Sequence, residues 1–169
     1  MRSRAPWVLV VFLLLVSTSA AAQSFTATLL GTNEVPPCDL DGTGTATITF
    51  VGGTTVNYTI VVNNITLPPI AQHIHIAAAG VNGPVVIALP GVWVGNTLVG
   101  STTAAQATID AVIANPAGHY VNVHDQPCPA GAVRGQLVGL AATPTVSTWG
   151  LIAIALVLAV AGMFVVKNV

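Results

Sequence analysis

The chain has 169 residues, of which 53% are hydrophobic and only 5% are charged, and its formal net charge is −1. That length favours a single domain. With four basic residues in the whole chain there is no basic footprint, which excludes a nucleic-acid-binding role.

The N-terminus is typical of a secretory signal peptide over residues 1–22. Arg2 and Arg4 precede the apolar run WVLVVFLLLV, and small residues follow before a predicted cut between Ala22 and Gln23. An uncleaved membrane anchor is the alternative, but the apolar run is short for a membrane span. We therefore expect an exported protein.

The two cysteines of the chain, Cys38 and Cys128, both lie in the exported part. An even number of cysteines in an oxidising compartment favours a disulfide. The alternative, two thiolates on a metal ion, lacks the CxxC spacing of such sites. We expect a bridge that closes a long loop and stabilises the domain by about 4 kcal/mol.

Residues 23–139 alternate strand patterns with turn residues. In TGTATITF threonines alternate with apolar residues, which is the period of a half-buried strand, and the Gly52–Gly53 turn leads into a second strand, TTVNYTIVVNN. Further strands are expected at residues 26–30, 72–76, 84–89, 120–124 and 133–138. One short helix is expected in TIDAVIANPAG, capped by Thr108. These elements predict an all-β fold, an antiparallel β-sandwich or Greek-key barrel with one short helix.

Two histidines alternate with isoleucines in the stretch AQHIHIAAAG. Successive side chains of a strand point to opposite faces. His73 and His75 therefore share one face, while Ile74 and Ile76 are expected to face the core.

The same alternation returns in GHYVNVHD, where Tyr120, Asn122 and His124 are expected to point outward. If the two strands are neighbours, the imidazoles of His73, His75 and His124 meet on one face. Three neutral imidazoles suit copper or zinc. The alternative is a set of hydrogen-bonded polar residues on a solvated or loop-covered face.

Arg134, in PAGAVRGQL, is the only basic residue of the exported domain. The planar fork of an arginine suits carboxylates and backbone carbonyls. We expect a structural clamp onto Glu34 or Asp125, with ligand binding as the alternative.

Four segments in order resemble the CHRD domain, the module named after repeats in chordin: FTATLLGTNEVPP, GTGTATITF, AQHIHIAAAGVNGPVVIAL and GHYVNVHDQPCPAGAVRGQL. The resemblance covers residues 25–138 and implies an immunoglobulin-like β-sandwich. The HxH strand and the later VxVH strand are also similar to copper-zinc superoxide dismutase, which implies copper ligands at His73, His75 and His124. The bridging histidine and the zinc loop of that enzyme have no counterpart here, so a full dismutase is not expected.

A C-terminal transmembrane anchor is predicted over residues 150–167. No charged side chain interrupts this apolar run before Lys167, and its length is about the minimum for a membrane span. Trp149 and Lys167 suit the two membrane interfaces. A buried core helix is the alternative, but no polar stripe accompanies the run.

Residues 140–149 are interpreted as a linker that carries a sorting motif. The stretch PTVSTWG is similar to the signature of the IPTL-CTERM class of bacterial sorting signals, with matches at Pro144, Thr145, Trp149 and Gly150. This resemblance implies a bacterial source and processing in the cell envelope. The basic cluster that usually ends such tails is reduced to a single lysine.

These observations predict an exported, membrane-anchored bacterial CHRD-domain protein. We expect a non-enzymatic module that binds an extracellular protein or matrix partner, whose identity the residues do not reveal. The alternative hypothesis is an envelope metalloprotein that holds copper or zinc through the three histidines.

Overall fold

The computed structural model describes residues 22–140 together with residues 152 and 155. The predicted signal peptide before residue 22, the sorting motif and the membrane anchor lie outside the described residues, as does the linker beyond residue 140. Ala22 and Gln23, which flank the predicted cut, are described, and the first strand begins at Gln23. Among the residues with a described placement, no helix is long and apolar enough to cross a membrane.

The described chain folds into β-strands with one α-helix and two short 3-10 helices. In chain order these are β1 (Gln23–Leu30), η1 (Gly31–Asn33), β2 (Thr43–Val51), β3 (Thr55–Asn63), β4 (Ala71–Ile76), β5 (Val85–Ala88), β6 (Thr97–Thr103), α1 (Gln106–Ala114), η2 (Pro116–Gly118), β7 (His119–His124), β8 (Val133–Gln136) and β9 (Val138–Gly139).

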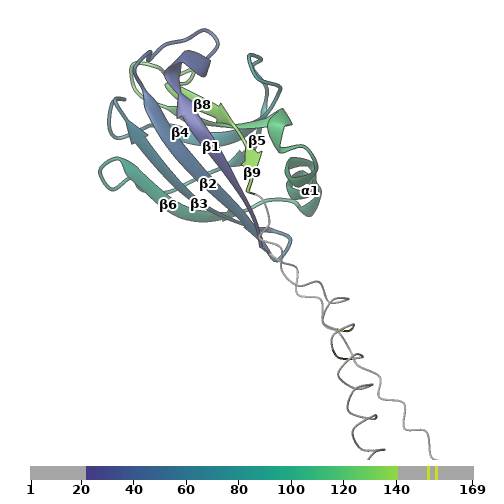
Figure 1. Ribbon diagram of the computed structural model, residues 1–169. Helices are drawn as coiled ribbons and strands as arrows, with labels where there is room; N and C mark the ends of the chain where they lie inside the picture. Colours follow the sequence, from purple (N-terminus) through teal and green to yellow (C-terminus); the bar gives the residue numbers. More distant parts are fainter. Residues whose placement is uncertain (1–21, 141–151, 153–154, 156–169) are drawn as a thin grey trace, which may run out of the picture.

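The strands form one antiparallel sheet that folds over on itself. Its order is β5-β4-β7-β8-β1-β2-β3-β6, with β9 paired to β1. Figure 1 shows β1, β2, β3 and β6 as one layer, facing the layer that contains β4 and β5. Fully buried aliphatic side chains fill the space between the layers, among them Leu29, Ile48, Ile60, Ile74 and Val121. The all-β prediction is confirmed: the fold is an antiparallel sandwich that nearly closes into a barrel.

The predicted hairpin is the longest pairing in the sheet. Strands β2 and β3 pair from Thr43 opposite Asn63 to Val51 opposite Thr55. Exposed and buried positions alternate along both strands, as the period-2 pattern predicts. The turn contains Gly52 and Gly53 at positive φ, a conformation that glycine adopts without a steric cost.

Strand β6 is an element that the sequence did not predict. It pairs along β3 from Thr97 to Thr103, and Leu98 is the one fully buried side chain in it. Gly100 lies opposite Tyr58, whose ring occupies the space where a side chain at residue 100 would stand. The strand therefore lacks the clear alternation by which its neighbours are recognised.

The start of the helix differs from the prediction. Helix α1 begins at Gln106 with Ala105 as its N-cap, so the predicted cap, Thr108, lies inside the first turn. The side chain of Gln106 donates a hydrogen bond to Asp110, four residues on, which supports the earlier start. Ile109 and Val112 are buried against the core, as the helical spacing predicts.

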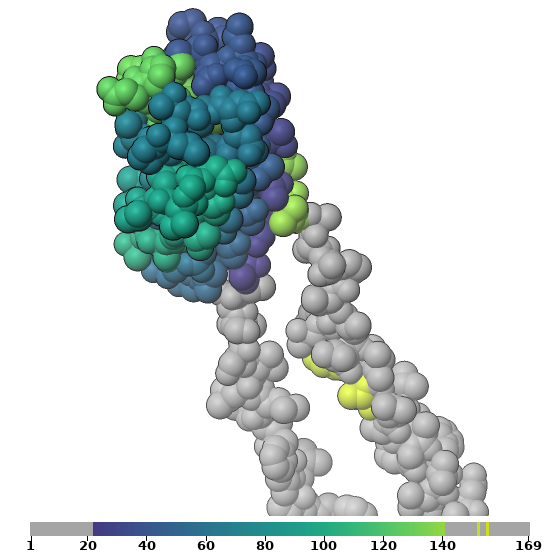
Figure 2. Space-filling view, turned by 90° about the vertical axis from the view of Figure 1, so that its left-hand side faces the viewer, coloured from purple at the N-terminus to yellow at the C-terminus, as the bar shows by residue number. Residues whose placement is uncertain are grey.

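The two ends of the described domain lie side by side. Strand β9 pairs with β1 through Val138 opposite Thr26, and the Leu140 amide donates to the Ser24 carbonyl. Figures 1 and 2 place these ends at one end of the domain, in purple and yellow-green. The loop around residue 38 and the green loop near residue 130 lie at the opposite end. Both chain ends therefore leave the domain away from those two loops.

Candidate metal centre

The two histidine-bearing strands are neighbours in the sheet. Strands β4 and β7 pair antiparallel, with His73 opposite Asn122 and His75 opposite Tyr120. His124 pairs with Ala71, one alternate position from His73 on the same face. The adjacency that the metal hypothesis requires is therefore present.

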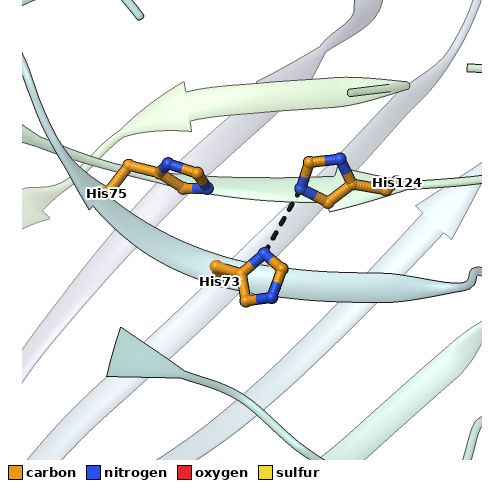
Figure 3. A group of neighbouring side chains, drawn as sticks. All are labelled: His73, His75 and His124. Carbon is orange, nitrogen blue, oxygen red and sulfur yellow. Dashed lines mark hydrogen bonds between the residues drawn. The ribbon is translucent and has the colours of Figure 1, made fainter. Parts of the chain in front are cut away.

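The three imidazoles converge on one point outside the sheet. Each of His73, His75 and His124 offers one ring nitrogen, and these three nitrogens lie within 4.8 Å of one another. His73 Nδ1 and His124 Nε2 are 3.3 Å apart, and Figure 3 shows the His75 ring beside this pair. Two nitrogens bound to one zinc ion at 2.0–2.1 Å each are roughly 3.3–3.6 Å apart. Within residues 22–140 the cluster has no fourth histidine, cysteine or carboxylate.

Backbone carbonyls determine which ring nitrogen of two histidines faces the cluster. His75 Nδ1 lies 2.9 Å from the Gly83 carbonyl oxygen, and His124 Nδ1 lies 3.1 Å from that of Pro129. A carbonyl oxygen only accepts, so both Nδ1 atoms carry the proton and both Nε2 atoms present a lone pair. Metal-bound histidines are commonly held in this way by a hydrogen bond to the distal ring nitrogen.

One of these lone pairs has no partner among the residues that the structure describes. His75 Nε2 is buried and makes no hydrogen bond to any of them. Leaving a buried acceptor unsatisfied costs about 1–3 kcal/mol. His124 Nε2, by contrast, accepts from His73 Nδ1, which must then carry a proton. A metal ion at the cluster would satisfy His75 and replace that shared proton.

Burial and mutual repulsion favour the neutral form of two of the three rings, those of His73 and His124. Desolvation lowers the pKa of His124, and the neighbouring His73 lowers it further. Burial and the proximity of His75 likewise lower the pKa of His73. At neutral pH both rings are therefore unprotonated at one nitrogen, which is the form that binds metal.

Loops cover the face that was expected to point outward. Tyr120, Asn122 and His124 are 2%, 3% and 9% exposed, because the loops that contain Gly83 and Pro129 fold over them. These side chains therefore point away from the core, as the strand parity predicts, but they are covered by loops and not exposed to solvent. Ile76 was expected in the core but is 43% exposed, as the last residue of β4.

Arg134 clamps Glu34 but not Asp125. Its Nε atom lies 4.0 Å from a Glu34 carboxylate oxygen and donates to the Asn33 carbonyl at 2.6 Å. The Asp125 carboxylate instead accepts from the backbone amides of Thr66 and Cys128, both at 2.8 Å. Asp125 is the first residue after β7, whereas Arg134 lies on β8 opposite Asn122 within that strand.

The predicted disulfide between Cys38 and Cys128 is confirmed. It joins the loop after η1 to the loop between β7 and β8. Pro129, whose carbonyl orients His124, is the next residue after the bridge. The disulfide therefore anchors a loop that contacts the histidine cluster directly.

The carboxyl of Glu34 gives the domain a testable pH dependence. Burial raises its pKa to about 7 against the opposing attraction of Arg134. Because the folded state holds this proton more tightly than the unfolded state, stability falls as the pH rises from about 4.5 to about 7. Glu34→Gln should remove this contribution, so the variant should gain roughly 2–3 kcal/mol relative to wild type between pH 5 and pH 8.

Urea unfolding of the two metal-free proteins at both pH values measures this difference. The histidine contributions are common to both proteins and cancel in the comparison. A free-energy difference between them that stays constant from pH 5 to pH 8 would show that Glu34 does not titrate in this range.

A family model described as the CHRD domain matches residues 25–137. The chain belongs to the CHRD domain family. The match begins within β1 and extends past the end of β8, and so includes the three histidines, both cysteines and the Arg134–Glu34 pair. No curated protein and no solved structure matches the chain.

The CHRD domain contains functional groups that the sequence did not reveal. The carbonyls of Gly83 and Pro129 orient two histidines, yet a backbone carbonyl has no signature in the sequence. Tyr120 stacks on His75, with ring centroids 4.8 Å apart and planes 11° apart. Its position opposite His75 follows only from the strand register.

Proposed function

We propose that this exported CHRD-domain protein binds a single copper or zinc ion through His73, His75 and His124. The buried lone pair of His75 Nε2 carries this proposal, because no group among the described residues satisfies it. The separation of 3.3 Å between the two neighbouring nitrogens supports it, since small ring rotations would bring all three within bonding distance of one ion.

Copper is the preferred ion. The ligand set consists of three imidazoles without a thiolate, and the general affinity order of nitrogen sites places divalent copper above zinc. Three ligands leave one coordination position open, as in metal sites that exchange or react with small molecules. The ligand set therefore suits a copper-binding or copper-carrying role, and we propose binding rather than catalysis as its function.

The two ends of the chain suggest where in the cell the protein acts. We propose export by the N-terminal signal and retention in the bacterial envelope by the C-terminal anchor. Residues 23 and 139 lie at one end of the domain, away from the loop of Pro129 that contacts the histidines. An anchor attached there would leave that loop facing away from the membrane. A surface module that binds a protein or matrix partner is compatible with this arrangement, but no contact of the described residues identifies such a partner.

A metal titration tests the proposal. Protein stripped with a chelator is titrated with copper and with zinc in the presence of a competing indicator. We expect one equivalent of copper per chain, held more tightly than zinc, and no tight equivalent in a His73→Ala/His75→Ala variant. Equal binding by wild type and this variant would contradict the proposal.

A further inference from the structure

The loop of residues 77–84 determines how His75 is held. The Gly83 carbonyl accepts from His75 Nδ1 at 2.9 Å, and the Gly83 amide donates to the Tyr120 hydroxyl at 3.2 Å. The ring of Tyr120 lies flat against that of His75. The backbone of one residue, Gly83, and the ring of Tyr120 thus fix the plane and the tautomer of this histidine.

The loop lies directly on strand β4. A Cβ atom added to Gly83 would come within 1.9 Å of the Ile76 carbonyl oxygen, so the backbones touch at this point. Because the loop lies so close to β4, contacts that fix the other residues of the loop also fix the position of the Gly83 carbonyl.

Arg134 contacts the ring that stacks on His75 and the two residues that precede Gly83. Its Nη1 atom donates to the Asn82 side-chain oxygen at 2.7 Å and lies 3.5 Å from the Val81 carbonyl oxygen. Its guanidinium carbon lies 4.9 Å from the centre of the Tyr120 ring. Asn82 in turn donates to the Val35 carbonyl at 2.7 Å, which ties the loop to the segment after η1.

Of these contacts, the hydrogen bond to Asn82 is shorter than the 4.0 Å that separates Arg134 from Glu34. From them we infer that Arg134 is a positioning residue for the metal centre, which acts on His75 through Asn82 and Tyr120. The expected effect of Arg134 on metal binding rests on the proposed function. The expected effect of Arg134 on the orientation of the His75 ring does not depend on any metal.

Asn82→Ala is the informative variant. Asn82 is exposed, so its loss removes the link between Arg134 and the loop without opening the core. Asn96→Ala is the matched control, because Asn96 is also a loop asparagine whose side chain donates a hydrogen bond to another element, at Asn63 in β3. Arg134→Lys keeps the charge but loses the planar fork.

Nitrogen NMR of the metal-free protein, purified from cells that express the whole chain, measures the His75 tautomer. Wild type and Asn96→Ala should show one tautomer, protonated at Nδ1. Asn82→Ala and Arg134→Lys should show a mixture of tautomers or a shifted Nδ1 signal, while the signals of His119 stay in place.

Copper binding provides the second measurement. Loss of a group that orients a metal ligand typically lowers affinity about 10- to 100-fold. We expect a loss of about tenfold in Asn82→Ala, with an altered visible spectrum of the copper complex, and no change in Asn96→Ala.

The two measurements separate the two hypotheses. An unchanged His75 tautomer in both Asn82→Ala and Arg134→Lys would overturn the positioning role. A changed tautomer in a protein that binds neither copper nor zinc would support the positioning role and overturn the proposed function. A changed tautomer with unchanged copper affinity would overturn the claim that the link matters for the metal.

Discussion

Replacing His124 by alanine is expected to weaken copper binding by at least a factor of about 100. Groups that merely orient a metal ligand are worth about 10- to 100-fold in affinity, and His124 is itself one of three ligands. The loss removes the ring that lies between His73 and the Pro129 carbonyl. A competition titration with a chelating indicator measures the dissociation constants of the two proteins.

His119→Ala is the control for this variant. His119 lies on the same strand, is 3% exposed, and bonds through Nδ1 to the carbonyl of Asn115, much as His124 bonds to that of Pro129. It differs in pointing to the other face, outside the cluster. If both variants lost copper equally, the effect would come from damage to strand β7 and not from a missing ligand.

Removing the disulfide is expected to lower the melting temperature of the metal-free domain by roughly 15–20 °C. The bridge joins residues 90 apart in sequence, and a loop of that length is worth about 4–5 kcal/mol in the chain-entropy account. For a domain of this size one kcal/mol corresponds to roughly 3–5 °C. Thermal unfolding of Cys38→Ser/Cys128→Ser beside wild type measures the shift.

Dithiothreitol provides an independent check on the same bridge. It should lower the melting temperature of wild type toward that of the double serine variant and leave the variant itself unchanged. A chelator must be present, because thiols also bind copper. A wild-type melting temperature that moves by less than a few degrees would mean that the bridge contributes little to stability.

The alternation of polar and apolar residues predicted the strands that have one buried face and one exposed face. Strands β2 and β3 alternate threonine with buried aliphatic residues, and both were recognised. Strand β6 was not recognised, because its position depends on pairing with β3 and on the space that Gly100 leaves for Tyr58. These interactions are tertiary, and no local pattern encodes them.

In the candidate site, too, some features could be predicted from local sequence and others depend on tertiary structure. The parity of His73, His75 and His124 is local information, and their convergence needed only the pairing of β4 with β7. The carbonyls that orient two of the rings come from loops, whose course a single sequence does not specify. For this reason the sequence left open whether this face is solvated or covered by loops, and the structure shows it covered.

Arg134 shows how a residue type can predict a role without its partners. A lone arginine among aliphatic strands predicts a clamp, and the ion pair with Glu34 fits that prediction. The contacts to Asn82 and Tyr120 connect the same clamp to the histidine cluster. Those contacts depend on the 77–84 loop, which the strand pattern leaves undefined.

X-ray absorption at the copper edge tests the central claim most directly. For wild-type protein loaded with one equivalent of copper, we predict a first shell that contains three imidazole nitrogens at about 2.0 Å. The signal from these rings should fall in proportion when His124 is replaced. A first shell dominated by oxygen or sulfur, or one unchanged by that replacement, would contradict the three-histidine site.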